Sequence, residues 1–173
     1  MFQLDRRLYR FVIRQRQVSY IVRVNLTRMR RCFVNALGSN TVVSASQFLA
    51  QEASIARARH VHLAGYFNCP RLQHDDLLTL VAKLSARGCT VSLDTQNDSL
   101  GDWRGAGRNL HQLLRLVDVF LPSEREACGI ADGATSVAQA IERLGARGMG
   151  MMKPHALLVV KCGDQGAICA RGG

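Results

Sequence analysis

The sequence lacks the patterns that identify several common classes of protein. No apolar run reaches the roughly eighteen residues that a membrane-spanning helix requires, so we expect no membrane span. The six cysteines form no CxxC pair and no zinc-type spacing, and the histidines form no HExxH. The dinucleotide motif GxGxxG, the phosphate-loop motif GxxxxGK and the hydrolase motif GxSxG are also absent. The usual sequence signatures of zinc sites, Rossmann or P-loop nucleotide sites and serine hydrolases are therefore excluded.

Acidic residues are nearly absent from the first 31 positions. Nine arginines stand there against one acid, Asp5, so this segment carries +8 of the net charge of +10. The basic character belongs to one end, and aromatic residues are not interleaved with the arginines in a recognisable module, which argues against nucleic-acid binding. An arginine-rich, acid-poor start also resembles a mitochondrial transit peptide.

The chain has the size of one domain, at 173 residues with 47% hydrophobic residues. Its scattered cysteines and the absence of a signal peptide indicate reduced, mostly buried thiols. We therefore expect a cytoplasmic protein, with a mitochondrial location as the alternative. We divide the chain into a basic leader of uncertain structure, residues 1–16, and a domain over residues 17–173.

The first part of this domain favours two short strands and a helix. Apolar residues alternate from Val18 to Val24 and return from Cys32 to Ala36, and Gly38-Ser39-Asn40 follows with turn chemistry. Residues 44–58 have helical apolar spacing.

The rest of the domain alternates between apolar strands and amphipathic helices. The predicted strands are residues 60–64, 90–93, 117–121 and 156–160. The predicted helices are one opened by Pro70 and Asp75-Asp76 and ended by Gly88, one over residues 110–116, and one capped by Thr135 or Ser136 and ended by Gly145. This order predicts an α/β fold with a doubly wound, mainly parallel sheet and helices on both faces.

In such a sheet ligands bind at the carboxyl ends of the strands, so the residues after each strand are candidates. Acids after Pro122 fit a ligand-binding rim, and they fit ordinary helix-start chemistry equally well. The glycines Gly163 and Gly166 would let backbone amides approach a phosphate, or they form only a hairpin turn. An aspartate directly after a strand, as Asp94 is, caps the loop more often than it has a function in binding or catalysis.

Together and in order, several segments resemble the ribokinase/PfkB carbohydrate kinases. The matching segments are residues 90–94, Trp103, 116–127 and 159–167, with 18–20, Arg31, 38–40 and 62–66 upstream. The resemblance covers roughly residues 17–170. Each motif is loose alone, but their common order and spacing are specific.

The resemblance implies transfer of phosphate from ATP to a sugar-type hydroxyl, with magnesium. The family's Asn-x-x-Glu motif falls on Ser123 to Glu126, so Glu126 would organise magnesium, and Ser123 replaces the asparagine. The implied nucleotide-binding residues are Ser123, Glu126, Lys161, Gly163 and Gly166, and the implied substrate-binding residues are Asn40, Gly65 and Tyr66. The partners would be ATP and a small sugar. Whether the chain forms a homodimer is left undecided by the resemblance.

Two motifs of the family have no counterpart in the sequence. No Gly-Gly-x-x-x-Asn precedes Val18, and no Gly-Ala-Gly-Asp occurs, because Gly105-Ala106-Gly107 is followed by Arg108. The missing aspartate would deprotonate the acceptor hydroxyl, so no catalytic residue is assigned. We therefore expect a fragment, incomplete at both ends. The alternatives are a nucleoside kinase of the adenosine type and a non-catalytic remnant that binds nucleotide or sugar.

Overall fold

The computed structural model describes most of the chain. The described residues are 20–27, 30–36, 38–51, 55, 57–103, 109–145 and 151–171. The predicted leader over residues 1–16, the start of the first predicted strand at Val18 and the glycines Gly105 and Gly107 lie outside them. Among the described helices none is long and apolar enough to cross a membrane.

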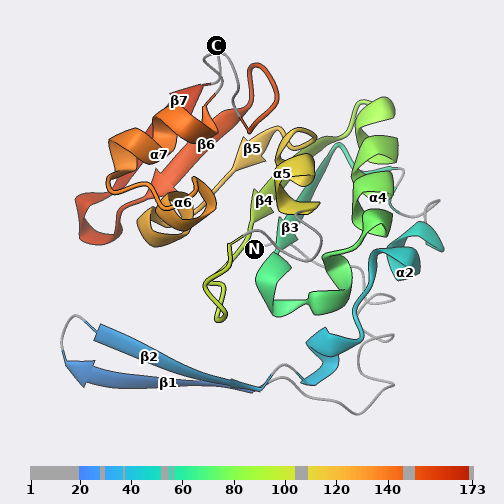
Figure 1. Cartoon of the computed structure of the whole chain (residues 1–173). Helices are drawn as coiled ribbons and strands as arrows, with labels where there is room; N and C mark the ends of the chain where they lie inside the picture. Colours follow the sequence, from blue (N-terminus) through green and yellow to red (C-terminus); the bar gives the residue numbers. More distant parts are fainter. Residues whose placement is uncertain are drawn as a thin grey trace.

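A five-stranded sheet forms the centre of the molecule (Figure 1). Its strands, in spatial order, are β3 (His60–Ala64), β4 (Thr90–Asp94), β5 (Val119–Phe120), β6 (Leu157–Lys161) and β7 (Ala167–Arg171). The first four are parallel, and β7 returns antiparallel to β6. The predicted mainly parallel α/β sheet is confirmed.

Strand β5 is shorter than the predicted strand over residues 117–121. Only Val119 and Phe120 form ladder pairs with both neighbouring strands. The flanking amides still bond to β4, from Asp118 to the Val91 carbonyl at 2.8 Å and from Leu121 to the Leu93 carbonyl at 2.9 Å. The segment therefore stays beside β4 although its regular pairing is brief.

Four described helices connect the parallel strands of this sheet. They are α4 (Asp75–Ala86), α5 (Asn109–Leu114), α6 (Glu124–Ile130) and α7 (Val137–Leu144). Acids Asp75 and Asp76 lie at the positive end of α4, and Gly88 follows its end with a φ of +78°, which a residue with a side chain rarely adopts. Pro70 does not open α4 as predicted, because it begins the separate 3-10 turn η3 (Pro70–Leu72).

The segment before the sheet contains a hairpin and a short helix. Strands β1 (Tyr20–Thr27) and β2 (Arg30–Ala36) pair antiparallel, as predicted, and lie apart from the central sheet (Figure 1). Helix α2 (Ala45–Leu49) is capped by Ser44 and covers the first part of the predicted helix over residues 44–58, of which residues 52–54 and 56 lie outside the described ones. It ends at Leu49, and the amide of Gln51 bonds to the Phe48 carbonyl three residues back, in a turn.

The two faces of the sheet differ in burial. Val91 and Leu93 of β4 are fully buried and belong to the same core as Phe120. Because β3 to β6 follow one another in sequence order, right-handed connections carry α4, α5 and the α6–α7 pair to the same face. On the other face, His60 and His62 are exposed and hydrogen-bond to Ser92 through Nε2 and Nδ1 at 2.8 and 2.7 Å. Helices α4 to α7 therefore lie together on the apolar face, whereas the sequence predicted helices on both faces. The difference arises because the described strands β3 to β6 follow one another without the reversal of strand order that a doubly wound sheet requires (Figure 1).

The cysteines differ in reactivity because they differ in burial. Cys69 and Cys89 are buried and Cys169 is exposed, all three with free thiols. Burial raises the pKa of the Cys69 and Cys89 thiols, and the Asp118 charge raises that of Cys89 further. At neutral pH we expect iodoacetamide to alkylate Cys169 roughly tenfold faster or more than either buried thiol, as peptide mass spectrometry would measure. Equal rates would contradict the buried positions.

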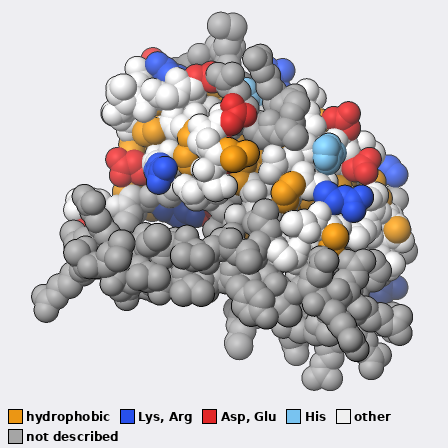
Figure 2. All heavy atoms as spheres, turned by 60° about the horizontal axis from the view of Figure 1, so that its bottom comes forward, with side chains coloured by type: hydrophobic (Ala, Val, Ile, Leu, Met, Phe, Trp, Pro, Cys, Tyr) orange, Lys and Arg blue, Asp and Glu red, His pale blue; other side chains and the backbone are white. Residues whose placement is uncertain are grey.

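The surface of the described residues carries both signs of charge. On the face drawn in Figure 2, acidic and basic side chains lie interspersed among hydrophobic ones rather than gathered in a patch of one sign.

Candidate functional site

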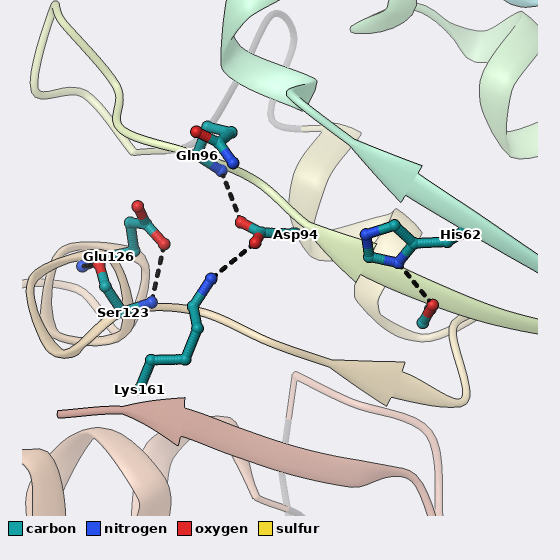
Figure 3. Close-up of polar contacts among 7 residues, drawn as sticks. His62, Asp94, Gln96, Ser123, Glu126 and Lys161 are labelled. Carbon is teal, nitrogen blue, oxygen red and sulfur yellow. Dashed lines mark hydrogen bonds and ion pairs between the residues drawn. The ribbon is translucent and has the colours of Figure 1, made fainter. Parts of the chain in front are cut away.

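Polar groups gather at the carboxyl ends of the parallel strands. Gly65 follows β3, Asp94 ends β4, Ser123 follows β5 and Lys161 ends β6. Because the strands are parallel, these positions share one edge of the sheet, the edge at which ligands bind in this architecture. Figure 3 shows the side chains that meet there.

Ser123 and Glu126 form a reciprocal cap at the start of α6. The Ser123 amide donates to Glu126 Oε2 at 2.8 Å, and the Glu126 amide donates to Ser123 Oγ at 3.4 Å. This arrangement is the capping box of a helix start, so the interpretation of the acids after Pro122 as helix-start chemistry is confirmed. The Glu126 residue is only 8% exposed, and its other carboxylate oxygen points away from Ser123 (Figure 3). One oxygen thus stabilises the helix while the second faces away from the cap.

The end of β6 brings Lys161 beside this cap. The Lys161 amide donates to the Pro122 carbonyl at 2.8 Å, and Ser123 and Lys161 form an isolated parallel bridge. The Lys161 side chain reaches past β5 to Asp94, with 2.6 Å between Nζ and Oδ2. Residues from β4, α6 and β6 therefore meet although they are far apart in sequence.

Asp94 joins this group more firmly than the sequence suggested. Its Oδ1 accepts from the Gln96 amide at 3.2 Å, which is the loop-capping role, while Oδ2 bonds to Lys161. The sequence placed Asp94 after a strand, but nothing in it indicated a lysine 67 positions later as the partner.

The glycine turn after β6 is a hairpin. Gly163 opens the 3-10 turn η5 (Gly163–Gln165), and the Cys162 amide donates to the Gly166 carbonyl at 2.8 Å. Both glycines have positive φ, +62° and +86°, and no chain atom lies within 4 Å of where either would carry a Cβ. The hairpin interpretation is confirmed, and the role of Gly163 and Gly166 in binding nucleotide stays a prediction.

The three predicted substrate residues differ in burial and in the element that carries them. The Gly65 amide donates to the Asp94 carbonyl at 2.9 Å, so Gly65 lies at the edge described above. Tyr66 is 2% exposed and belongs to the core, where burial raises the pKa of its hydroxyl. Asn40 lies in the 3-10 turn η1 (Gly38–Thr41). Among the described residues no hydrogen bond joins it to Glu126 or Lys161, and its role stays a prediction.

An aromatic contact anchors the loop after β4 on α6. Asp98 is buried and accepts from the Trp103 amide at 2.7 Å, which fixes the end of the loop. The Trp103 ring packs edge-on to Phe67 with 5.9 Å between centroids, and the Arg125 guanidinium lies 6.0 Å from its centre. The ring covers Gly129 of α6. This contact was not predicted from the sequence, because no local pattern links Trp103 to a glycine so much later in the chain.

The donor set at this edge fits a magnesium–nucleotide complex. Within the described ranges no three His, Cys, Asp or Glu side chains form a metal cluster of their own. Magnesium in nucleotide sites needs only one or two carboxylates, with phosphate oxygens and water as the other ligands. The second oxygen of Glu126 matches the carboxylate requirement, and the nearly half-exposed Lys161 side chain carries a positive charge that suits the phosphates rather than the ion (Figure 3).

Comparison with known proteins places the chain in a family. The sequence matches the pfkB family of carbohydrate kinases over residues 8–173. No curated protein sequence matches the chain. The fold is similar to that of Anopheles gambiae adenosine kinase, in complex with P1,P4-di(adenosine-5) tetraphosphate, with a TM-score of 0.67 and 15% identity over 91% of this chain and 46% of that one.

Two ribokinase structures are similar to the same extent. The ribokinase of Giardia lamblia has a TM-score of 0.64 and 14% identity over 89% of this chain and 45% of its own. A putative ribokinase II of E. coli, in complex with ATP and Mg2+, has a TM-score of 0.61 and 20% identity over 90% and 47%. The chain thus spans about half the length of these structures. Since the family match covers nearly the whole sequence, the chain belongs to the pfkB family of carbohydrate kinases.

Proposed function

We propose that this chain supplies the nucleotide side of an ATP-dependent kinase that phosphorylates a hydroxyl of a sugar or sugar-like molecule. The observation that carries the proposal is the meeting of Glu126 and Lys161 at the carboxyl edge of the sheet, beside the turn at Gly163. The E. coli neighbour in complex with ATP and Mg2+ supports the choice of nucleotide and ion.

Each residue has a distinct part in the proposed site. Magnesium bound together with ATP would neutralise part of the phosphate charge. The outward oxygen of Glu126 would hold the ion directly or through water, since its other oxygen is held by the Ser123 amide. Lys161 would place a positive charge on the phosphates, and the amides at Gly163 and Gly166 would approach them closely.

The acceptor is a sugar in our first proposal and a nucleoside in the second. The adenosine kinase neighbour favours the nucleoside alternative, and Gly65 is the predicted substrate residue that lies at the proposed edge. We also propose that the 173-residue chain alone transfers little phosphate. A Gly-x-Gly-Asp motif is absent from its sequence, so no general base is assigned.

Nucleotide binding tests the proposed site directly. We expect isothermal calorimetry to detect MgATP binding to the wild type, weakened about tenfold or more in Glu126→Gln because the carboxylate charge is lost. Glutamine keeps an oxygen for the Ser123 amide, so the helix start is retained. Glu142→Gln removes the same charge from an exposed position of α7 and should bind as the wild type does. Equal binding by both variants would contradict the role of Glu126.

A coupled phosphorylation assay separates the remaining alternatives. With MgATP and a panel of sugars and adenosine, we expect binding without appreciable turnover by this chain alone. Robust turnover would overturn the inactivity that we propose, and the substrate giving it would identify the acceptor. Binding of MgATP without turnover, even at high protein concentration, fits the non-catalytic alternative.

A further inference from the structure

We propose that Asp94 is a positioning residue, which holds the ammonium group of Lys161 where it can receive the phosphates of a nucleotide. The inference rests on the proposed function, because Lys161 is a nucleotide-binding residue only if that proposal holds. Its motivation is the ion pair between the ends of β4 and β6, at 2.6 Å.

Asp94 is the more fixed partner of this pair. Its side chain is 18% exposed, against 44% for Lys161, and the Gln96 amide holds its Oδ1. Lys161 comes from the far side of β5, so its side chain has to cross one strand to reach Asp94. The pair therefore draws a flexible side chain from the end of β6 toward the middle of the sheet edge.

A lysine ammonium has three N–H donors, and Asp94 Oδ2 needs only one of them. The others remain for phosphate oxygens, since the Lys161 side chain is nearly half exposed. A lysine already held in place loses less side-chain entropy when the ligand binds than a freely moving one. Asp94 thus favours binding through Lys161, although its own negative charge repels phosphate.

The two effects of Asp94 have opposite signs, and this makes them separable. With Lys161 present, Asp94→Asn should weaken binding because the ammonium loses its ionic anchor. In a Lys161→Met background the same change should strengthen binding, because only the repulsion between Asp94 and phosphate remains to be removed. A merely structural role of Asp94 would change binding in the same direction in both backgrounds.

Another ion pair, between Lys153 and Asp118, provides a matched control. Lys153 and Asp118 lie 2.5 Å apart, before β6 and β5, and therefore at the opposite edge of the sheet. The sequence contains only three lysines, Lys83, Lys153 and Lys161, so each can be followed by acetylation and mass spectrometry. Lys153→Met breaks a similar pair far from the proposed site.

The experiment is calorimetry with MgATP and with inorganic pyrophosphate on wild type, Asp94→Asn, Lys161→Met, the double variant and Lys153→Met. We expect Asp94→Asn to bind about fivefold more weakly than wild type and the double variant to bind more tightly than Lys161→Met. Lys153→Met should bind as wild type does. MgATP should protect Lys161 from acetylation in the wild type, less so in Asp94→Asn, and should leave Lys153 unprotected.

Asparagine keeps an oxygen for the Gln96 amide, and matching thermal unfolding curves would establish that the variants fold. If Asp94→Asn binds MgATP as well as or better than wild type, Asp94 is not a positioning residue, and the proposed function stands. If the wild type binds neither MgATP nor pyrophosphate, the proposed function fails and this inference falls with it.

Discussion

Replacing Gly129 with alanine is expected to displace Trp103 and destabilise the chain by about 1–3 kcal/mol, the usual cost of overpacking. A Cβ at position 129 would lie 2.5 Å from Cδ2 of the Trp103 ring, far inside van der Waals contact. Alanine is the better helix former, so the helix itself should gain about 0.5–1 kcal/mol and the loss must come from the ring. Urea denaturation measures the free energy of unfolding.

The effect should also reach the proposed nucleotide site. Trp103 is the only tryptophan in the sequence, so its fluorescence reports the loop after β4 without interference. We expect a changed emission maximum in Gly129→Ala and weaker MgATP binding, because α6 carries both Gly129 and Glu126.

A second background isolates the steric cause. In Trp103→Leu the ring is absent, and Gly129→Ala should then be neutral or stabilising. If alanine destabilised both backgrounds by the same amount, the contact between the ring and α6 would not be the reason.

Replacing Phe120 with alanine should cost about 3–5 kcal/mol of the free energy of unfolding, the range for a large buried aromatic side chain. Phe120 is among the largest fully buried side chains and lies on β5, whose two residues join β4 to β6. The cavity would therefore open in the middle of the sheet, where helices and strands both pack.

Val119→Ala is the matched comparison for Phe120. Val119 is the other residue of β5 but is only half-buried, since successive strand residues point to opposite faces. Val119→Ala should lower the free energy of unfolding clearly less than Phe120→Ala does in the same denaturation experiment. Equal losses at both positions would show that disturbing β5, rather than the cavity, determines the result.

The features predicted best from the sequence are helix ends, which depend on residues close to one another in the chain. The acids Asp75 and Asp76 and the glycine Gly88 bounded α4, and the acids after Pro122 indicated a helix start that is realised as a capping box. These signals act over three or four residues, so they are visible without knowledge of the fold. The predicted length of β5 was wrong because apolar spacing continues beyond the point where backbone pairing stops.

The parts of the candidate site that could not be predicted from the sequence are contacts between segments that lie far apart along the chain. The contact of Lys161 with Asp94 and that of Trp103 with Gly129 join segments that only the sheet and α6 bring together. Tyr66 shows the same limit in a different way. Tyr66 follows β3 as predicted, but its side chain is buried in the core, and no pattern in the sequence gives that direction.

The order of the strands has a consequence for how the protein folds. Each strand from β4 to β7 lies beside the strand that precedes it in the chain, so every pairing in the sheet closes only the segment between consecutive strands. Closing these segments costs less chain entropy than pairing strands that lie farther apart in the sequence. During synthesis each new strand can add to the one already made as soon as it leaves the ribosome, so the sheet can grow in the direction of translation.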